Sequence, residues 1–207
     1  MPAAPVPSQT RIINAAYAEC GSTTRINSIN DELAFRARDL WDDIVSEYLA
    51  EHPWNFQIKR AAVNLTSDVD LTGTEYSHAY AVPADCSRWL PPAKEAPNYF
   101  RGEIEGRYLL TDRELGGPIR YIRNDVTVSD WSPHFVRAVV LRLAESLADG
   151  VTQSEGKKDR LVDKADKALR RAKRIDGLES GNDRRGAVTV NSSWLQARMH
   201  PNSQIGR

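Results

Sequence analysis

Residues whose side chains could carry out chemistry are few in this chain, and they are scattered. Cys86 directly follows Asp85, and His78 precedes both, so the three could be assembled into a nucleophile, a base and an orienting acid. Pro83 lies just before this pair, in what reads as a strand or a turn, and no separate base signal accompanies the cysteine. These residue types in this pattern therefore favour a structural role.

Paired carboxylates and metal ligands give no stronger signal. Glu103 and Glu105 alternate along a predicted strand and share a face, where such pairs are usually solvated rather than used for acid–base chemistry. Two cysteines cannot complete a zinc site, and the four histidines lack ligand spacing. The sequence contains no phosphate-binding glycine loop, GxSxG turn or HExxH helix. It accordingly predicts no catalytic residue, no metal and no cofactor, so we expect a protein that is not an enzyme.

Charge is distributed unevenly, although the formal net charge is zero. From Val151 onward the chain has 13 Lys and Arg against 7 Asp and Glu, which leaves 15 of the 28 basic and 21 of the 28 acidic residues before it. An acidic body with a basic C-terminal third fits partners of both signs. A solvated helix face is the alternative explanation of the basic stretch.

The basic residues are concentrated in a helix predicted from Ser154 to about Asp176. Its apolar stripe is narrow and rich in alanine, which would let the helix lie close against a neighbour. The helix has no aromatic residue for base stacking, so any contact with nucleic acid would be independent of sequence. The residues expected to face a lumen or a neighbouring subunit are Lys157, Lys158, Arg160, Lys164, Lys167, Arg170, Arg171 and Arg174.

The segment 177–207 is rich in Gly, Ser, Asn and Arg and has little periodicity. Such a composition buries too little apolar surface to offset an ordering cost of about 1–2 kcal/mol per residue for the backbone alone. It nevertheless contains Trp194, Leu195 and Met199, which suggests that this tail docks on a partner. A tail that folds back onto its own body is the alternative.

Helices are predicted on both sides of a region of strands. Apolar residues at helical spacing predict a helix over 10–20 and one long helix over 31–51, whose apolar face includes Leu33. Pro53 ends the second helix. Short runs rich in Val, Tyr, Ile and Leu then predict strands at 56–65, 76–82, 87–90, 108–110 and 119–123.

The helical pattern returns at Ser132, which can cap a helix whose first position is Pro133, and 149–150 closes it. The predicted fold class is α+β: an antiparallel helical bundle with an inserted small antiparallel β lobe and an extended C-terminal tail. The corresponding units are 1–54, 55–130, 131–176 and 177–207. No apolar run approaches the roughly 20 residues of a membrane span, and no signal peptide is recognisable, so we expect assembly in the cytosol of the producing cell.

Four motifs occur in order along the chain. They are Pro53-Trp54-Asn55-Phe56, the segment YAVPADCSRW at 80–89, Arg120-Tyr121-Ile122 followed by Trp131-Ser132-Pro133, and LAESLA at 143–148. Together, over roughly residues 12–176, they make the chain resemble the tail tubular protein A, or head-to-tail adaptor, family of short-tailed bacteriophages. The tail after Gly177 departs from this pattern.

The resemblance implies a virion protein assembled in the host cytoplasm, without membrane contact. Family adaptors form a twelve-subunit ring of identical subunits beneath the portal protein, with the tail nozzle, a protein like tail tubular protein B, on the other face. Packaged DNA passes through the lumen with transient, non-specific contacts. The 55–130 lobe is then the tail-side or inter-subunit surface. The C-terminal segment reaches the portal, with Trp194, Leu195, Arg198 and Met199 as the binding residues. The rival hypothesis is a nucleic-acid-binding accessory protein that uses helix 157–174.

Overall fold

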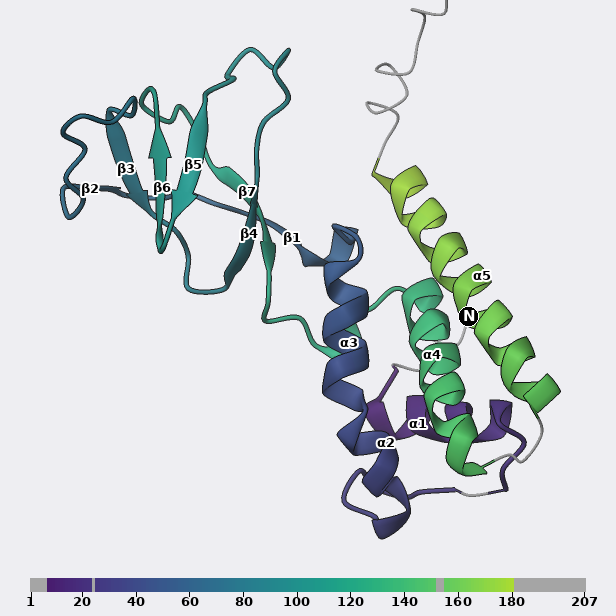
Figure 1. The fold of residues 1–207 in the computed structure, drawn as a ribbon. Coiled ribbons are helices and arrows are strands. Elements are labelled where there is room, and N and C mark those ends of the chain that lie inside the picture. Colours follow the sequence, from purple (N-terminus) through teal and green to yellow (C-terminus); the bar gives the residue numbers. More distant parts are fainter. Residues whose placement is uncertain (1–6, 24, 152–154, 181–207) are drawn as a thin grey trace, which may run out of the picture.

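The chain folds into a helical body and a β lobe that projects from one end of it (Figure 1). The computed structural model describes residues 7–23, 25–151 and 155–180. Within these described residues, helices come first and last, and every strand lies between them. The predicted α+β fold, a helical bundle with an inserted antiparallel β lobe, is therefore confirmed.

The first helix begins and ends where the sequence predicts. Helix α1 (Gln9–Glu19) is capped by Ser8, whose hydroxyl accepts a hydrogen bond from the Arg11 amide. Gly21, at φ 75°, adopts the left-handed conformation that commonly follows a helix end. Ile12, Ile13, Ala16 and Tyr17 are buried, as their spacing predicts.

The single helix predicted over 31–51 is instead broken into three pieces: a 3₁₀ turn (Glu32–Ala34), α2 (Phe35–Asp39) and α3 (Trp41–Ala50). The Asp31 side chain accepts from the Leu33 amide and sets up the tight first turn. A second tight turn occurs at Leu40, whose amide donates to the carbonyls of Arg36 and Arg38. As a consequence Leu33 is 57% exposed, and the prediction that it lies on the buried face is wrong.

Two long helices complete the body. Helix α4 (Pro133–Val151) starts at Ser132, whose hydroxyl accepts from the Phe135 amide, so the predicted cap is confirmed. Helix α5 (Glu155–Glu179) runs three residues beyond the predicted end at Asp176. The two helices run antiparallel and side by side, while α1 and α3 also pack on α4 (Figure 1). Phe135, Leu143 and Leu147 of α4 are fully buried at the centre of this body.

The β lobe consists of two antiparallel sheets. Three strands, β1 (Ile58–Ala61), β7 (Ile119–Arg123) and β4 (Cys86–Leu90), form one sheet in that order. The other sheet has the order β2-β3-β6-β5, with β2 (Leu65–Thr66), β3 (His78–Ala81), β6 (Tyr108–Thr111) and β5 (Gly102–Glu105). The lobe's own core is small and consists of Tyr80, Leu109, Ile119 and Tyr121.

Two strand predictions need correction. The strand predicted over 56–65 is two strands in different sheets, because the chain crosses from one sheet to the other between β1 and β2. Strand β5 lies where Glu103 and Glu105 alternate along a predicted strand, although its exposed, glutamate-rich sequence kept it out of the strands predicted from apolar runs. It pairs with β6 through a two-residue hairpin in which Gly106, at φ 57°, supplies the left-handed turn.

The β lobe is joined to the body at the Trp54-Asn55-Phe56 motif. Trp54 is completely buried, donates its indole N–H to the Tyr48 carbonyl at 2.8 Å, and packs edge-on against Phe135. Asn55 is bound by the end of α5: its amide donates to the Asp176 carboxylate at 3.0 Å and its side-chain nitrogen to the Asp176 carbonyl at 2.7 Å. His52 Nε2 is hydrogen-bonded to the Asp176 carboxylate, and the Ser180 hydroxyl donates to the Asn55 side-chain oxygen. We call His52, Asn55, Asp176 and Ser180 the root clamp.

Candidate functional site

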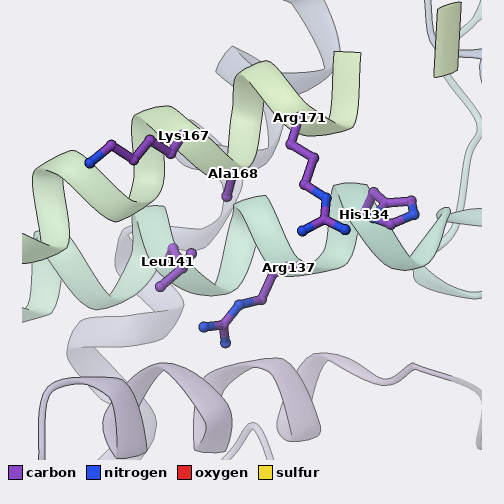
Figure 2. A pocket seen from close by; sticks show the side chains of 6 residues that line it. All are labelled: His134, Arg137, Leu141, Lys167, Ala168 and Arg171. Atoms are coloured by element: carbon purple, nitrogen blue, oxygen red, sulfur yellow. The ribbon is translucent and has the colours of Figure 1, made fainter. Parts of the chain in front are cut away.

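Several basic side chains line a groove between α4 and α5 (Figure 2). Its volume is about 350 Å³. Three turns of α4 contribute His134, Arg137 and Leu141, and α5 contributes the rest of the lining. The lining residues are His134, Arg137, Leu141, Lys167, Ala168 and Arg171. The lining therefore combines four basic side chains with two apolar ones, Leu141 and Ala168, which we call the floor of the groove.

The antiparallel packing of α4 and α5 creates this groove. Leu161, Ala165 and Ala172 of α5 are buried against the body, and the small alanines allow the close approach that the sequence predicts. With these residues turned inward, Lys167 and Arg171 lie at the edge of the contact, one turn apart and exposed. On α4, His134, Arg137 and Leu141 follow helical spacing and line the same groove, while the Arg137 side chain points away from α5 (Figure 2).

Glutamate 19 compensates part of the charge near the groove. Arg137 Nη1 lies 2.8 Å from Glu19 Oε1, and Lys164 Nζ lies 3.4 Å from Glu19 Oε2. Burial alone would raise the pKa of Glu19, but the hydrogen bonds and charges of Arg137 and Lys164 lower it below its ordinary value. This carboxylate therefore stays ionised and partly neutralises two of the cations.

The charges of two basic side chains in the groove are less neutralised by neighbouring carboxylates, so these two are better able to bind an external partner. Among the described residues, Lys167 is paired with Asp163 alone, at 3.5 Å, in an exposed contact within α5 that water screens strongly. Arg171 has no hydrogen bond or ion pair among the residues that the structure describes. The groove is thus net cationic at the surface, with its least compensated charge on α5.

The predicted basic residues of 157–174 separate into three groups. Lys157 lies against Gly21, and Lys164 binds Glu19, so both face the body. Lys167 and Arg171 line the groove. Arg160, Arg170 and Arg174 are exposed and make no ion pair within the described part of the chain, while Lys158 is exposed and has a partner.

Sequence reasoning did not anticipate the contributions of α4. His134 and Arg137 are three residues apart, but only the pairing of α4 with α5 brings them beside the basic helix. Lys173 was also left out of the predicted set, and it binds Glu51 at the end of α3, at 2.9 Å. Nothing in the sequence marks these three residues, because their partners lie more than 25 residues away along the chain.

The three residues considered for nucleophilic chemistry are not assembled into a site. Asp85 binds Lys59 at 2.8 Å and accepts a hydrogen bond from the Tyr121 hydroxyl at 3.0 Å. His78 lies in the other sheet, and Cys86 makes no hydrogen bond to it within the described residues. Burial raises the pKa of the Cys86 thiol, which disfavours the reactive thiolate.

The described residues also lack two other kinds of functional feature. They contain no cluster of three or more His, Cys, Asp or Glu side chains that could hold a metal ion. None of their helices combines the length and the apolar character required to cross a membrane. The proposed portal-binding residues Trp194, Leu195, Arg198 and Met199 lie outside the described residues.

No family model matches this chain, and no curated protein matches it either.

Proposed function

We propose that this chain is a head-to-tail adaptor of a short-tailed phage, a ring-forming subunit between the portal and the tail nozzle. The observation that carries the proposal is the two-part architecture. A helical body and a β lobe project away from each other, so one subunit can present the body to one partner and the lobe to another (Figure 1). The ordered sequence motifs, from Trp54-Asn55-Phe56 to the α4 segment 143–148, support the same assignment.

The positions of two motifs are consistent with this role. Trp54 and Asn55 hold the lobe to the body through buried contacts, and Asp85 ties β1 to β7 and β4 inside the lobe. These residues keep the two parts in a fixed relation, which a connector between two partners requires. We propose the same non-catalytic role for the whole chain, with no cofactor.

The proposal is tested by mixing the purified full chain with the portal protein of the phage. Electron microscopy of the mixture should show an added ring beneath the portal, with twelve subunits. Particle mass measured on the same sample should rise by the corresponding multiple of 23.2 kDa. A chain that stays unattached at micromolar concentration would rule out the adaptor function.

The proposed portal contact through Trp194, Leu195, Arg198 and Met199 has its own test. A chain that ends at Ser180 keeps all of α5 and the bond from Ser180 to Asn55, so it should remain folded. We expect it to lose portal binding, and we expect Trp194→Ala to weaken that binding by about 2–4 kcal/mol. If the shortened chain binds the portal as well as the full chain, the contact lies elsewhere.

The competing proposal is a nucleic-acid-binding accessory protein. The exposed Arg160, Arg170 and Arg174 favour it, because unpaired cations on one helix can contact phosphates. Asp159 and Asp163 are interspersed on the same helix, which weakens such a surface. A titration with random-sequence duplex DNA discriminates: the accessory protein would bind in low salt and dissociate steeply as salt is added.

A further inference from the structure

Two surfaces of the helical body carry opposite charge, and they lie on different sides of it. The first is the groove between α4 and α5. The second, which we call the acidic face, is formed by Phe35, Asp39, Asp42 and Asp43, whose spacing places them on the outer side of α2 and α3. We propose that the acidic face of one subunit docks into the groove of the next copy of this chain. This inference rests on the proposed adaptor function and names the contact that closes its ring.

The acidic face is available for a partner. Trp41, Ile44 and Tyr48 turn the opposite side of α3 into the core. Asp39, Asp42 and Asp43 are exposed and have no ion pair among the described residues. Arg38 is the nearby cation, and its guanidinium lies over the Phe35 ring at 6.0 Å from the centroid. The carboxylates on this face are therefore left for an external cation.

An apolar side chain accompanies the acidic ones. Phe35 is 59% exposed, which is unusual for an aromatic residue on a helix that helps to enclose a core. Buried aromatic residues at the centre of an interface, surrounded by polar contacts, contribute much of the binding energy in protein complexes. The groove offers the matching chemistry, since the Leu141 and Ala168 floor is apolar and its rim is cationic.

The positions of the two surfaces favour a head-to-tail contact. The groove lies between α5 and α4, and α1 adjoins it, because Arg137 and Lys164 both bind Glu19 of α1. The acidic face belongs to α2 and α3, which pack on another side of α4 and bind it through Glu47 and Arg142. A contact between two different patches on each copy repeats around an axis and generates a ring when the rotation closes.

The experiment uses two charge-reversed variants of the full chain. The first, Asp39→Lys with Asp43→Lys, makes the acidic face basic. The second, Lys167→Glu with Arg171→Glu, makes the groove acidic. Because all four positions are exposed, both variants should fold, and their circular dichroism and thermal unfolding verify this. Asp39→Asn with Asp43→Asn provides a milder second form of the first variant.

A matched control reverses the same amount of charge elsewhere. Asp68→Lys with Glu95→Lys changes two exposed carboxylates of the β lobe that make no ion pair within the described ranges. Sedimentation velocity in low salt, with each protein alone and with the portal, measures assembly. The wild type and the control should assemble. In each face variant the association constant should fall about a hundredfold, because juxtaposed like charges repel.

Mixing the two face variants gives the decisive result. In the mixture every contact pairs a basic surface with an acidic one, so alternating rings should form although neither variant assembles alone. Face variants that assemble like the wild type would overturn the inference and leave the adaptor function intact. The inference would also be overturned if the groove variant still forms rings but loses its affinity for random duplex DNA in low salt. The groove would then bind nucleic acid rather than a second copy of the chain. A wild type that assembles neither alone nor on the portal would overturn both proposals.

Discussion

The helical body and the β lobe are held together by different kinds of interaction. Among the described residues, 23 buried apolar side chains form one cluster in the body, whereas the lobe's own cluster has 4. The lobe depends instead on specific polar contacts, in which Asp85 binds Lys59 and Tyr121, and the Tyr80 hydroxyl accepts from the Leu115 amide. The body is thus built around one large apolar cluster, and in the lobe a much smaller cluster is accompanied by these polar contacts.

This difference is informative about assembly. The two edge strands of the four-stranded sheet, β2 and β5, expose Leu65 and Ile104, and only a small apolar cluster lies behind them. The body also exposes apolar side chains, among them Phe35 and Leu178, but these surround a much larger buried core. Exposed strand edges are surfaces that natural proteins usually cover or protect. We therefore expect the body to be stable by itself and the lobe to gain stability when partners surround it.

The largest expected effect tests the two cores with one matched substitution. Leu143 of α4 and Leu109 of β6 are both completely buried. Leu143→Ala should cost about 4–5 kcal/mol and Leu109→Ala about 2–3 kcal/mol, because the smaller cluster can collapse around the lost side chain more readily. Urea denaturation followed by tryptophan fluorescence measures both. Equal losses would show that the lobe's core is as tightly packed as that of the body.

The next effect concerns the junction between the two regions. Asp176→Ala removes the acceptor of the Asn55 amide and of His52, and it should destabilise the protein by about 1–3 kcal/mol because two partly buried donors lose their partner. Hydrogen exchange should also speed up at Asn55. Asp163→Ala, on the exposed side of α5, is the control and should change stability by under about 0.5 kcal/mol.

A smaller effect is expected in the polar network of the lobe. Tyr121→Phe removes the hydrogen bond to Asp85 and should cost about 0.5–1.5 kcal/mol in urea denaturation. The hydrogen bond from Lys59 holds the pKa of Asp85 below its ordinary 3.8. A lowered pKa means that the contribution of this carboxylate to stability is complete above pH 4 and is lost as the pH falls through the lowered value. Asp85→Asn should remove this acid dependence.

The smallest effect on stability is expected on the acidic face. Phe35→Ser should change the free energy of unfolding by no more than about 0.5 kcal/mol, because the side chain is mostly exposed. The same variant should assemble more weakly than the wild type in sedimentation velocity. A large loss of stability would mean that Phe35 belongs to the core of its own subunit rather than to an interface.

The body was predictable from the sequence because its signals are local. Helical spacing of the apolar residues and the cap at Ser132 locate α1 and α4, and Gly21 marks the end of α1. The break at Leu40 was not predictable from periodicity, which continues through the turn. At the break, the Leu40 amide donates to the carbonyls of Arg36 and Arg38. A separate tight turn at Asp31 contains Leu33, which is exposed.

The lobe and the groove were less predictable because they depend on pairing between distant segments. The run 56–65 is predicted as one strand, yet β1 pairs with β7 and β2 pairs with β3. The division of this run between two sheets is therefore set by strands that lie elsewhere along the chain. The basic residues of α5 were recognisable as a group. Their separation into body-facing, groove-lining and outward residues depends on how α5 packs against α1 and α4.

The root clamp gives the chain a defined path for mechanical force. Its bonds tie the last turn of α5 to Asn55, where the β lobe begins. A pull applied beyond Ser180 therefore loads Asn55 and the base of the lobe through several hydrogen bonds at once, rather than unwinding α5 one turn at a time. Tension on the last turn of α5 is thus delivered directly to the base of the β lobe, and the rest of α5 lies outside this path.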